Sequence, residues 1–357
     1  MRKFVISLVL LLSIVSISSV QAQDEPVLRI GYLPIMVMEQ HFVAEDQGWY
    51  DELGVEYETI RFQGGPAIVQ AFAAGELDVA WVGINPSLVM AARGIPVSVV
   101  AANVYDGLDV IANDTFAEIW AENPTAEAFS IYEEQEGRKL RVATLSQGST
   151  PDTVLRLWLD QLGLTTDNIE LSGLGIDQVQ AALAANRVDA SLIMEPVITL
   201  SQEQDWGFQV IVPGGEILPL QPGATLTVSQ DLIDNNPDLV SQLVDIHIRG
   251  TLFANDDLDE AARIASEGIG AEILPVEIAR IAVESPTLNW ISDPNIIIDS
   301  TQTYNAFQVE IGVFDEAVAM EDLFDTSFFD ALIETNPEYA EQLPNPLNES
   351  EDAEETE

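Results

Sequence analysis

The chain contains no cysteine, and Lys3 and Lys139 are its only lysines. Without cysteine there can be no disulfide, no thiolate chemistry and no lipid-bearing cysteine. Its two histidines, His41 and His247, lie far apart in the sequence and lack the spacing of a metal-binding or catalytic pair. The sequence has neither a GxSxG nucleophile elbow nor a phosphate-binding loop of the nucleotide-hydrolase type. Signals of an enzyme are therefore weak, and we expect no catalysis, no metal and no cofactor.

Basic residues are also scarce: 13 Lys and Arg face 60 Asp and Glu, which gives a net charge of −47 at pH 7. So acidic a chain is repelled by nucleic acids and by anionic membranes, and we expect neither as a partner. The acids are spread along the chain except in residues 345–357, where we expect an acidic, disordered tail. We hypothesise that this acidic, lysine-poor composition is an adaptation to high salt.

The N-terminus has the three parts of a secretory signal peptide. Arg2 and Lys3 precede the apolar run 4–15, and small residues follow up to Ala22. We expect residues 1–22 to be removed after Ala22 and the protein to be periplasmic or extracellular. The alternative is an uncleaved membrane anchor, although the apolar run is short for a membrane span.

The rest of the chain alternates between short apolar strands and amphipathic helices, which predicts α/β lobes with mostly parallel sheets flanked by helices. In the first series the expected strands are 28–32, 55–62, 77–82, 97–102 and 108–113, and the expected helices are 41–53, 66–74 and 86–93. In the second series the expected strands are 140–145, 168–172, 188–193 and 208–212, and the expected helices are 151–163, 176–185 and 196–203. Residues 114–137 are polar and acidic, and we expect them to form a surface insertion.

Two segments repeat one pattern 111 positions apart, Ile68–Val79 and Val179–Ala190. In each, an Ala-rich helix stops at a residue that tolerates the left-handed conformation, Gly75 or Asn186. An apolar residue and an Asp then open a short buried strand. The repeat predicts two lobes of similar build with a cleft between them. We expect lobe 1 to be discontinuous, comprising residues 27–113 and 225–340, and lobe 2 to comprise 114–224.

Four expected helix starts follow strand ends, where ligands bind in open α/β sheets. They lie at Gly64 and Gly65, at Asn85, at Ser149 and Thr150, and at Glu195. Helix N-termini offer unpaired N–H groups and partial positive charge, so their convergence would suit an anion or a carbonyl-rich ligand.

Three further residues are candidates for contact with a ligand. Tyr105 and Trp290 are aromatics in turn-like contexts that could stack on a ligand, although aromatics more often belong to the core. His41 follows the first strand and could face the cleft, or it could pack inside the lobe.

Several segments resemble those of nitrate/sulfonate/taurine-type solute-binding proteins of ABC importers. They are Ile30-Gly31-Tyr32, the run Phe42 to Tyr50, Gly64 to Ala80, Gly83 to Pro86, Gly148 to Pro151 and Val188-Asp189-Ala190 with Glu195-Pro196. The resemblance covers roughly residues 29–231. It implies a two-lobed, type II clamshell that closes on a small ligand and delivers it to an ABC permease, acting as a monomer.

The resemblance also implies where the ligand lies. It would contact the loop from Pro34 to His41, the Gly64-Gly65 turn, Asn85, the Ser149-Thr150 turn and Glu195. Relatives in this family bind sulfonates, nitrate, bicarbonate, thiamine-precursor pyrimidines or riboflavin, so the ligand would be a small sulfonate-, nitrate- or bicarbonate-like compound or a pyrimidine-like one. The alternative is a catalytic member of the superfamily, a pyrimidine-precursor synthase or desulfinase-like enzyme, and the absence of cysteine argues against it.

The chain departs from a simple anion binder in three respects. Lysine is nearly absent, and Met36 and Met38 make the first loop apolar. Glu195 would bring a carboxylate to the site, where it either pairs with an amino or amidine group of the ligand or only caps a helix.

Overall fold

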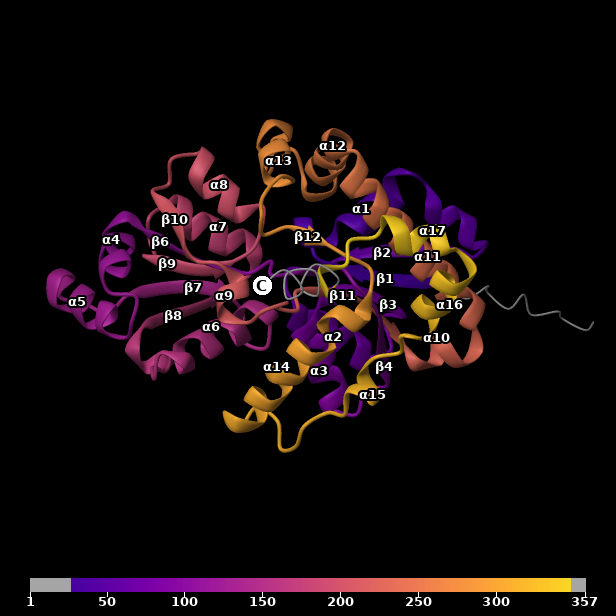
Figure 1. Ribbon diagram of the computed structural model, residues 1–357, viewed down its shortest axis with the longest axis horizontal. Coiled ribbons are helices and arrows are strands. Elements are labelled where there is room, and N and C mark those ends of the chain that lie inside the picture. The colour runs from indigo at the N-terminus through magenta and orange to yellow at the C-terminus, as the bar shows by residue number, and fades with distance from the viewer. Residues whose placement is uncertain (1–26, 348–357) are drawn as a thin grey trace, which may run out of the picture.

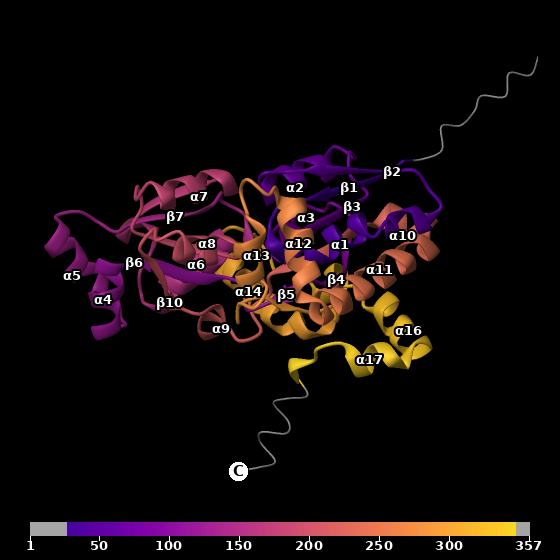
Figure 2. The ribbon, with the colours of Figure 1, turned by 90° about the horizontal axis from the view of Figure 1, so that it is seen from above.

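The computed structural model describes residues 27–347, and it contains two lobes, each built on a five-stranded sheet flanked by helices (Figures 1 and 2). This confirms the predicted α/β, two-lobed architecture. The predicted signal peptide, 1–22, and residues 348–357 of the predicted tail lie outside the described residues.

The first sheet has the strand order β2-β1-β3-β11-β4. Four strands run in one direction, and β11 runs antiparallel between β3 and β4. Their bounds are Leu28–Tyr32 (β1), Tyr57–Arg61 (β2), Val79–Gly83 (β3), Val97–Ala102 (β4) and Ala224–Ser229 (β11). The chain therefore returns to the first sheet after building the second.

The second sheet repeats this order as β8-β7-β9-β6-β10, with β6 antiparallel between β9 and β10. Its strands are Asp109–Asn113 (β6), Arg141–Leu145 (β7), Glu170–Leu174 (β8), Ala190–Ile193 (β9) and Phe208–Val212 (β10). The assignment of 108–113 to the first lobe was wrong, because this strand pairs only with strands of the second sheet. A strand's own residues do not say which of two similar sheets it joins.

The repeated helix ends have the expected backbone conformation. Helix α2 (Gly65–Ala73) and helix α7 (Ile176–Ala184) precede Gly75 and Asn186, whose φ angles are 70° and 51°. The next N–H in each case donates back into the last turn, at 2.9 Å in both lobes. Both helices therefore stop where the sequence indicated, and the chain turns into β3 and β9.

The Asp of each repeat binds the arginine of the neighbouring strand. Arg29 donates to Asp78 from its backbone N–H at 2.9 Å and from its guanidinium at 2.9 and 2.7 Å. Arg141 donates to Asp189 in the same way, at 2.9, 3.0 and 2.7 Å. This bidentate pairing fixes the register of β1 against β3 in the first lobe and of β7 against β9 in the second.

The two segments that cross between the lobes lie side by side. Asn103 donates its N–H to the carbonyl of Ala224 at 2.8 Å, and Asp106 donates its N–H to the carbonyl of Gln221 at 2.9 Å. The buried Gln221 side chain also accepts from the Leu108 N–H at 3.1 Å. Within the first crossing segment, β5 (Val104–Tyr105) pairs antiparallel with β12 (Asn289–Trp290), which brings a third part of the chain beside the crossings.

The segment expected to be a surface insertion is part of the second lobe's core. It forms α4 (Asp114–Glu122) and α5 (Glu127–Glu136). The buried rings of Phe116 and Phe129 meet at 5.2 Å, and Phe129 lies 5.7 Å from the ring of Trp158. The acids face outward while the aromatics face inward, so composition alone misled the prediction.

The remaining helices cover the sheets. The predicted helices around the cleft are α1 (Glu39–Asp46), α3 (Ile84–Ala92), α6 (Thr150–Gln161) and α8 (Val197–Glu203), with the short α9 (Gly214–Ile217) after β10. After β11 come α10 (Gln230–Asn235), α11 (Pro237–Asp256), α12 (Leu258–Ile269), α13 (Val276–Ala282), α14 (Ile298–Glu310), α15 (Met320–Leu323), α16 (Ser327–Thr335) and α17 (Pro337–Gln342). Figure 1 shows that most of this part lies on the first lobe, with α13 beside α8 of the second. No helix between residues 27 and 347 has the length and apolar character required to cross a membrane.

Candidate functional site

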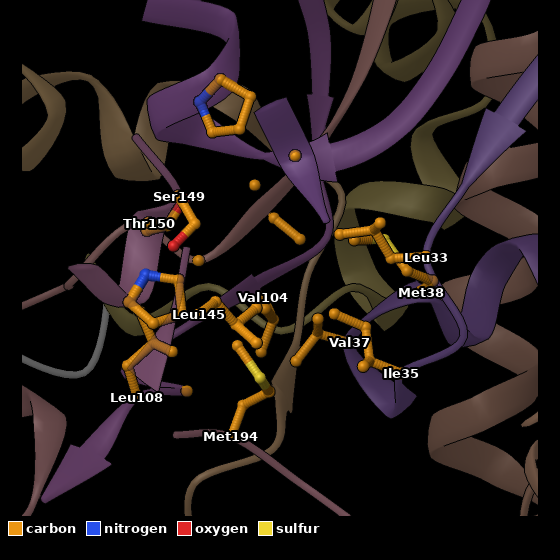
Figure 3. A pocket seen from close by; sticks show the side chains of 17 residues that line it. Leu33, Ile35, Val37, Met38, Val104, Leu108, Leu145, Ser149, Thr150 and Met194 are labelled. Carbon is orange, nitrogen blue, oxygen red and sulfur yellow. The ribbon is translucent and has the colours of Figure 1, made fainter. Parts of the chain in front are cut away.

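A narrow cavity lies between the lobes, beside the crossing segments (Figure 3). Its free space is about 30 Å³, room for about two water molecules. The lining is mostly apolar and comes from both lobes. The labelled apolar side chains are Leu33, Ile35, Val37, Met38, Val104, Leu108, Leu145 and Met194.

Three helix N-termini converge at this cavity. Gly65 begins α2, and Thr150 begins α6 after the N-cap Ser149, whose hydroxyl accepts from the Asp152 N–H at 3.3 Å. Gly65, Ser149 and Thr150 line the cavity, and Asn85 lies in the first turn of α3 beside Thr150. The cavity therefore has an apolar wall and an edge of helix N-termini, where N–H groups and the helix dipole favour negative charge.

Asn85 joins the two lobes. Its backbone N–H donates to the Thr150 hydroxyl at 3.2 Å, and its amide donates to the Gly148 carbonyl at 3.0 Å. Gln308, on α14, donates to the Asn85 side-chain oxygen from behind. Beside them a Cβ on Gly83 would lie only 2.3 Å from the Thr150 hydroxyl oxygen. The lobes are thus in contact at this point, and only a glycine at position 83 permits this approach.

Gly64 and Pro34 adjoin the cavity without lining it. A Cβ on Gly64 would lie 3.5 Å from the Ser146 hydroxyl of the opposite lobe. Pro34 is buried between Leu33 and Ile35, whose side chains do line the cavity. Both residues shape the loops that carry the lining.

His41 is not at the cavity. It is fully buried in the first lobe, with its ring 4.4 Å from Tyr32 and its Nδ1 at 2.8 Å from the Tyr50 hydroxyl. Burial lowers the pKa of His41 to about 3, so the imidazole is neutral. The cleft-facing prediction was wrong because α1 turns this side chain inward, toward the first sheet.

The two candidate aromatics support the site from behind. Trp290 is buried and donates its indole N–H to the Met36 carbonyl at 3.4 Å, which holds the first loop. Tyr105 is half-buried in β5, next to the lining residue Val104. Neither ring lines the cavity, so neither is placed to stack on a ligand bound there.

Glu195 points away from the cavity, although its neighbour Met194 lines it. Its carboxylate accepts from the Thr199 N–H at 3.1 Å and from the Thr199 hydroxyl at 3.0 Å. Burial raises the pKa of Glu195, and the hydrogen bonds from Thr199 oppose that rise. The sequence left two alternatives for Glu195, and the structure shows the one in which its carboxylate caps the start of α8. The same carboxylate lines a second, acidic pocket and not the cavity.

The lining residues that sequence reasoning missed are apolar. Leu145 ends β7, Met194 follows β9, and Val104 and Leu108 lie on the first crossing segment. The position of Leu145 and Met194 at the carboxyl ends of strands was a usable signal. The sequence alone does not reveal their role, because buried apolar residues at strand ends are also typical of an ordinary core.

Comparison with known proteins agrees with this geometry. The NMT1-like family model matches residues 21–269. A Bacillus subtilis (strain 168) protein named "Putative aliphatic sulfonates-binding protein" is 25% identical over 307 residues, covering 84% of this chain and 86% of that protein. The periplasmic nitrate-binding protein NrtA from Synechocystis PCC 6803 matches with a TM-score of 0.71 at 16% identity, covering 90% of this chain and 92% of that one.

A second solved structure is the alkanesulfonate-binding protein SsuA from Xanthomonas axonopodis pv. citri bound to MOPS. It matches with a TM-score of 0.68 at 18% identity, covering 84% of this chain and 99% of that one. At these identities the structures establish the fold, and the family match spans more than half of the chain. The chain therefore belongs to the NMT1-like family, as a solute-binding protein with the two-lobed fold of periplasmic binding proteins.

Proposed function

We propose that this protein captures a small organic anion with an apolar body, an aliphatic sulfonate being the best candidate, and delivers it to an ABC importer outside the cytoplasm. The observation that carries the proposal is the pairing of an apolar wall with three helix N-termini around one cavity. An alkyl chain would contact the apolar wall, and an oxyanion would accept from N–H groups. Nitrate and bicarbonate have no apolar part to contact that wall, and a pyrimidine-like ligand would lack the full negative charge.

Individual roles follow from position. We assign the N–H groups at the start of α2, near Gly65, and at the start of α6, near Thr150, to the oxyanion. Ser149, the N-cap of α6, and Asn85, which bridges the two lobes, would orient those N–H groups. No Lys, Arg or His lines the cavity, so neutral donors would have to bind the anion.

Entry requires the lobes to separate. The free space of about 30 Å³ is smaller than a sulfonate with its alkyl chain, and the Asn85–Thr150 contact closes one side. We propose that the lobes swing about the paired crossing segments, near 103–108 and 220–224, as in hinge closure. On this basis lobe 2 would begin near residue 109 rather than 114.

A binding role is favoured over a catalytic one. Ser149 and Thr150 carry the hydroxyls at the cavity, and both accept structural hydrogen bonds from backbone N–H groups. Neither has a histidine or carboxylate positioned as a general base among the residues that line the cavity. Nothing in the described residues favours the alternative of a synthase or desulfinase. Export by a cleaved signal peptide and a monomeric state remain parts of the proposal.

The test is a ligand panel on the protein from residue 23 onward, in molar salt, by native mass spectrometry and thermal shift. The panel holds ethanesulfonate, butanesulfonate, taurine, nitrate, bicarbonate, a hydroxymethylpyrimidine and riboflavin. A ligand at about 100 times its Kd adds about 2.7 kcal/mol of apparent stability. We expect the alkanesulfonates to give the largest shift and Thr150→Val to reduce it. A shift with nitrate alone, or none with any anion, would overturn the assignment.

A further inference from the structure

A second pocket lies on the other side of the crossing segments, between α8 and α9 of the second lobe and the loop after α13. It is larger than the cavity, about 740 Å³, and open to solvent on one side. Its lining includes five carboxylates and no Lys, Arg or His. The carboxylates are those of Asp106, Asp109, Glu195, Glu216 and Glu284.

Asp109 is the residue that distinguishes this pocket from the acidic surface elsewhere. Its side chain is fully buried, and Oδ1 accepts from the Gly214 N–H at 2.9 Å. Its other oxygen, Oδ2, has no hydrogen-bond partner. Burying a carboxylate oxygen without a partner is costly, so this oxygen is an unused acceptor at the wall of a hollow.

Glu195 adds a second buried carboxylate to the same wall. Burial raises the pKa of Asp109 to about 7, the charge of Glu195 adds to that rise, and no basic side chain lines the pocket to oppose it. A positively charged group in the pocket would stabilise the ionised form of both carboxylates.

The pocket is distinct from the proposed anion cavity, because neighbouring side chains face opposite ways. Leu108 and Met194 line the cavity, whereas Asp109 and Glu195, the next residue in each case, line the acidic pocket. The same two segments therefore present apolar side chains to the cavity and carboxylates to the acidic pocket.

The pocket is lined both by the second lobe and by the segment that follows α13. Asp109 and Glu195 belong to the second lobe, whereas Glu284 and the segment 285–289 follow α13, in the C-terminal part. An occupant would contact both sides and would offset the repulsion that arises when these carboxylates come together.

We infer that this acidic pocket is a binding site for a small organic cation, held through a primary ammonium or guanidinium group. Such groups carry several N–H donors that can reach separated carboxylates. A multivalent metal is disfavoured, since no three His, Asp or Glu side chains in residues 27–347 are grouped to hold one. The inference goes beyond the proposed anion binding and does not depend on it.

The experiment is isothermal titration of the full protein with 1,4-diaminobutane, in a buffer with about 0.5 M NaCl to screen diffuse attraction to the acidic surface. We expect one saturable site in the wild type. Asp109→Asn should weaken it at least tenfold, because the variant keeps the acceptor for Gly214 but removes the charge. The matched control is Asp160→Asn, an exposed acid at the end of α6 whose loss changes net charge equally.

The variants and the salts decide the outcome. Glu195→Gln serves as a second variant should Asp109→Asn fold poorly, since Gln keeps an acceptor for Thr199. Equal affinity for 1,4-diaminobutane in the wild type and in a folded site variant would overturn the inference. So would non-saturable binding, if titration with KCl gave the same result. A negative alkanesulfonate panel leaves this test unaffected, so the two proposals fail separately.

Discussion

Arg141 holds Asp189 by three hydrogen bonds, one from its backbone N–H and two from its guanidinium. The same carboxylate also accepts from Arg138 at 3.0 Å. Burial by itself raises the pKa of Asp189, but the hydrogen bonds from Arg141 and Arg138 outweigh it and lower the pKa to about 2. Asp189 is therefore ionised in the folded protein at any pH above that value.

Asp189→Asn should destabilise the protein and change its acid unfolding. Because the folded pKa lies below the ordinary value of 3.8, the stabilisation is complete above about pH 4 and is lost as pH falls toward 2. We expect a loss of about 1–2 kcal/mol at pH 7, reduced from the full shift because both arginines are partly exposed. Denaturant unfolding at pH 7 and pH 3 measures it. The exposed Asp177→Asn is the control, and equal loss in both variants would contradict the prediction.

Glu39 should have the opposite effect on the pH profile. Its carboxyl group is fully buried and neither oxygen has a hydrogen-bond partner. Burial, aided by the charge of Asp46, raises the pKa of Glu39 well above its usual 4.5. The folded state therefore retains a proton that the unfolded state releases, so stability is complete below about pH 4.5 and falls as pH rises.

Glu39→Gln removes this dependence. Relative to the variant, the wild type should lose up to about 1.4 kcal/mol per pH unit between pH 4.5 and the folded pKa. Urea unfolding midpoints from pH 4.5 to 8 measure the difference. Parallel profiles for the two proteins would show that Glu39 is ionised in the fold.

Crosslinking the lobes should abolish ligand uptake. A Cβ on Gly83 would lie 3.2 Å from the Thr150 Cβ, a few tenths of an ångström closer than a relaxed disulfide requires. The chain has no other cysteine, so Gly83→Cys with Thr150→Cys can form only this bond. We expect the oxidised variant to give no thermal shift with butanesulfonate, and the reduced variant to give a shift that is smaller than that of the wild type, because both substituted residues line the cavity. Equal shifts in both states would mean that the ligand enters without lobe separation.

Salt should stabilise the protein strongly. A net charge of −47 repels itself in the compact state, and added ions screen this repulsion. The unfolding midpoint should rise from low to molar NaCl, and sodium sulfate at equal ionic strength separates screening from exclusion effects. Equal midpoints in low and molar salt would refute the hypothesis of an adaptation to salt.

The sequence predicted features that depend on local chemistry. Gly75 and Asn186 end their helices because few other residues accept a positive φ, and an Asp follows each because it pairs with a strand arginine. The convergence of helix starts at Gly65 and Thr150 followed from strand polarity.

What the sequence did not reveal depends on partners distant in the chain. Whether β6 joined the first or the second sheet was decided by β9 and β10, which come later. His41 and Glu195 each point to one side of a segment, and a side-chain direction depends on where an element begins to within one residue. The apolar wall was missed because Leu145 and Met194 look like ordinary core residues until both lobes are assembled.

The two antiparallel strands have a mechanical consequence. β6 follows the first crossing and β11 follows the second, and each is hydrogen-bonded on both sides within its sheet, whereas β4, which leads into the first crossing, lies at the edge of the first sheet. Where the chain leaves each crossing it therefore continues into an interior strand, which is harder to detach from its sheet than an edge strand. In the proposed separation of the lobes, each of these two strands would share the load with two neighbouring strands, so bending would be concentrated in the residues of the crossings.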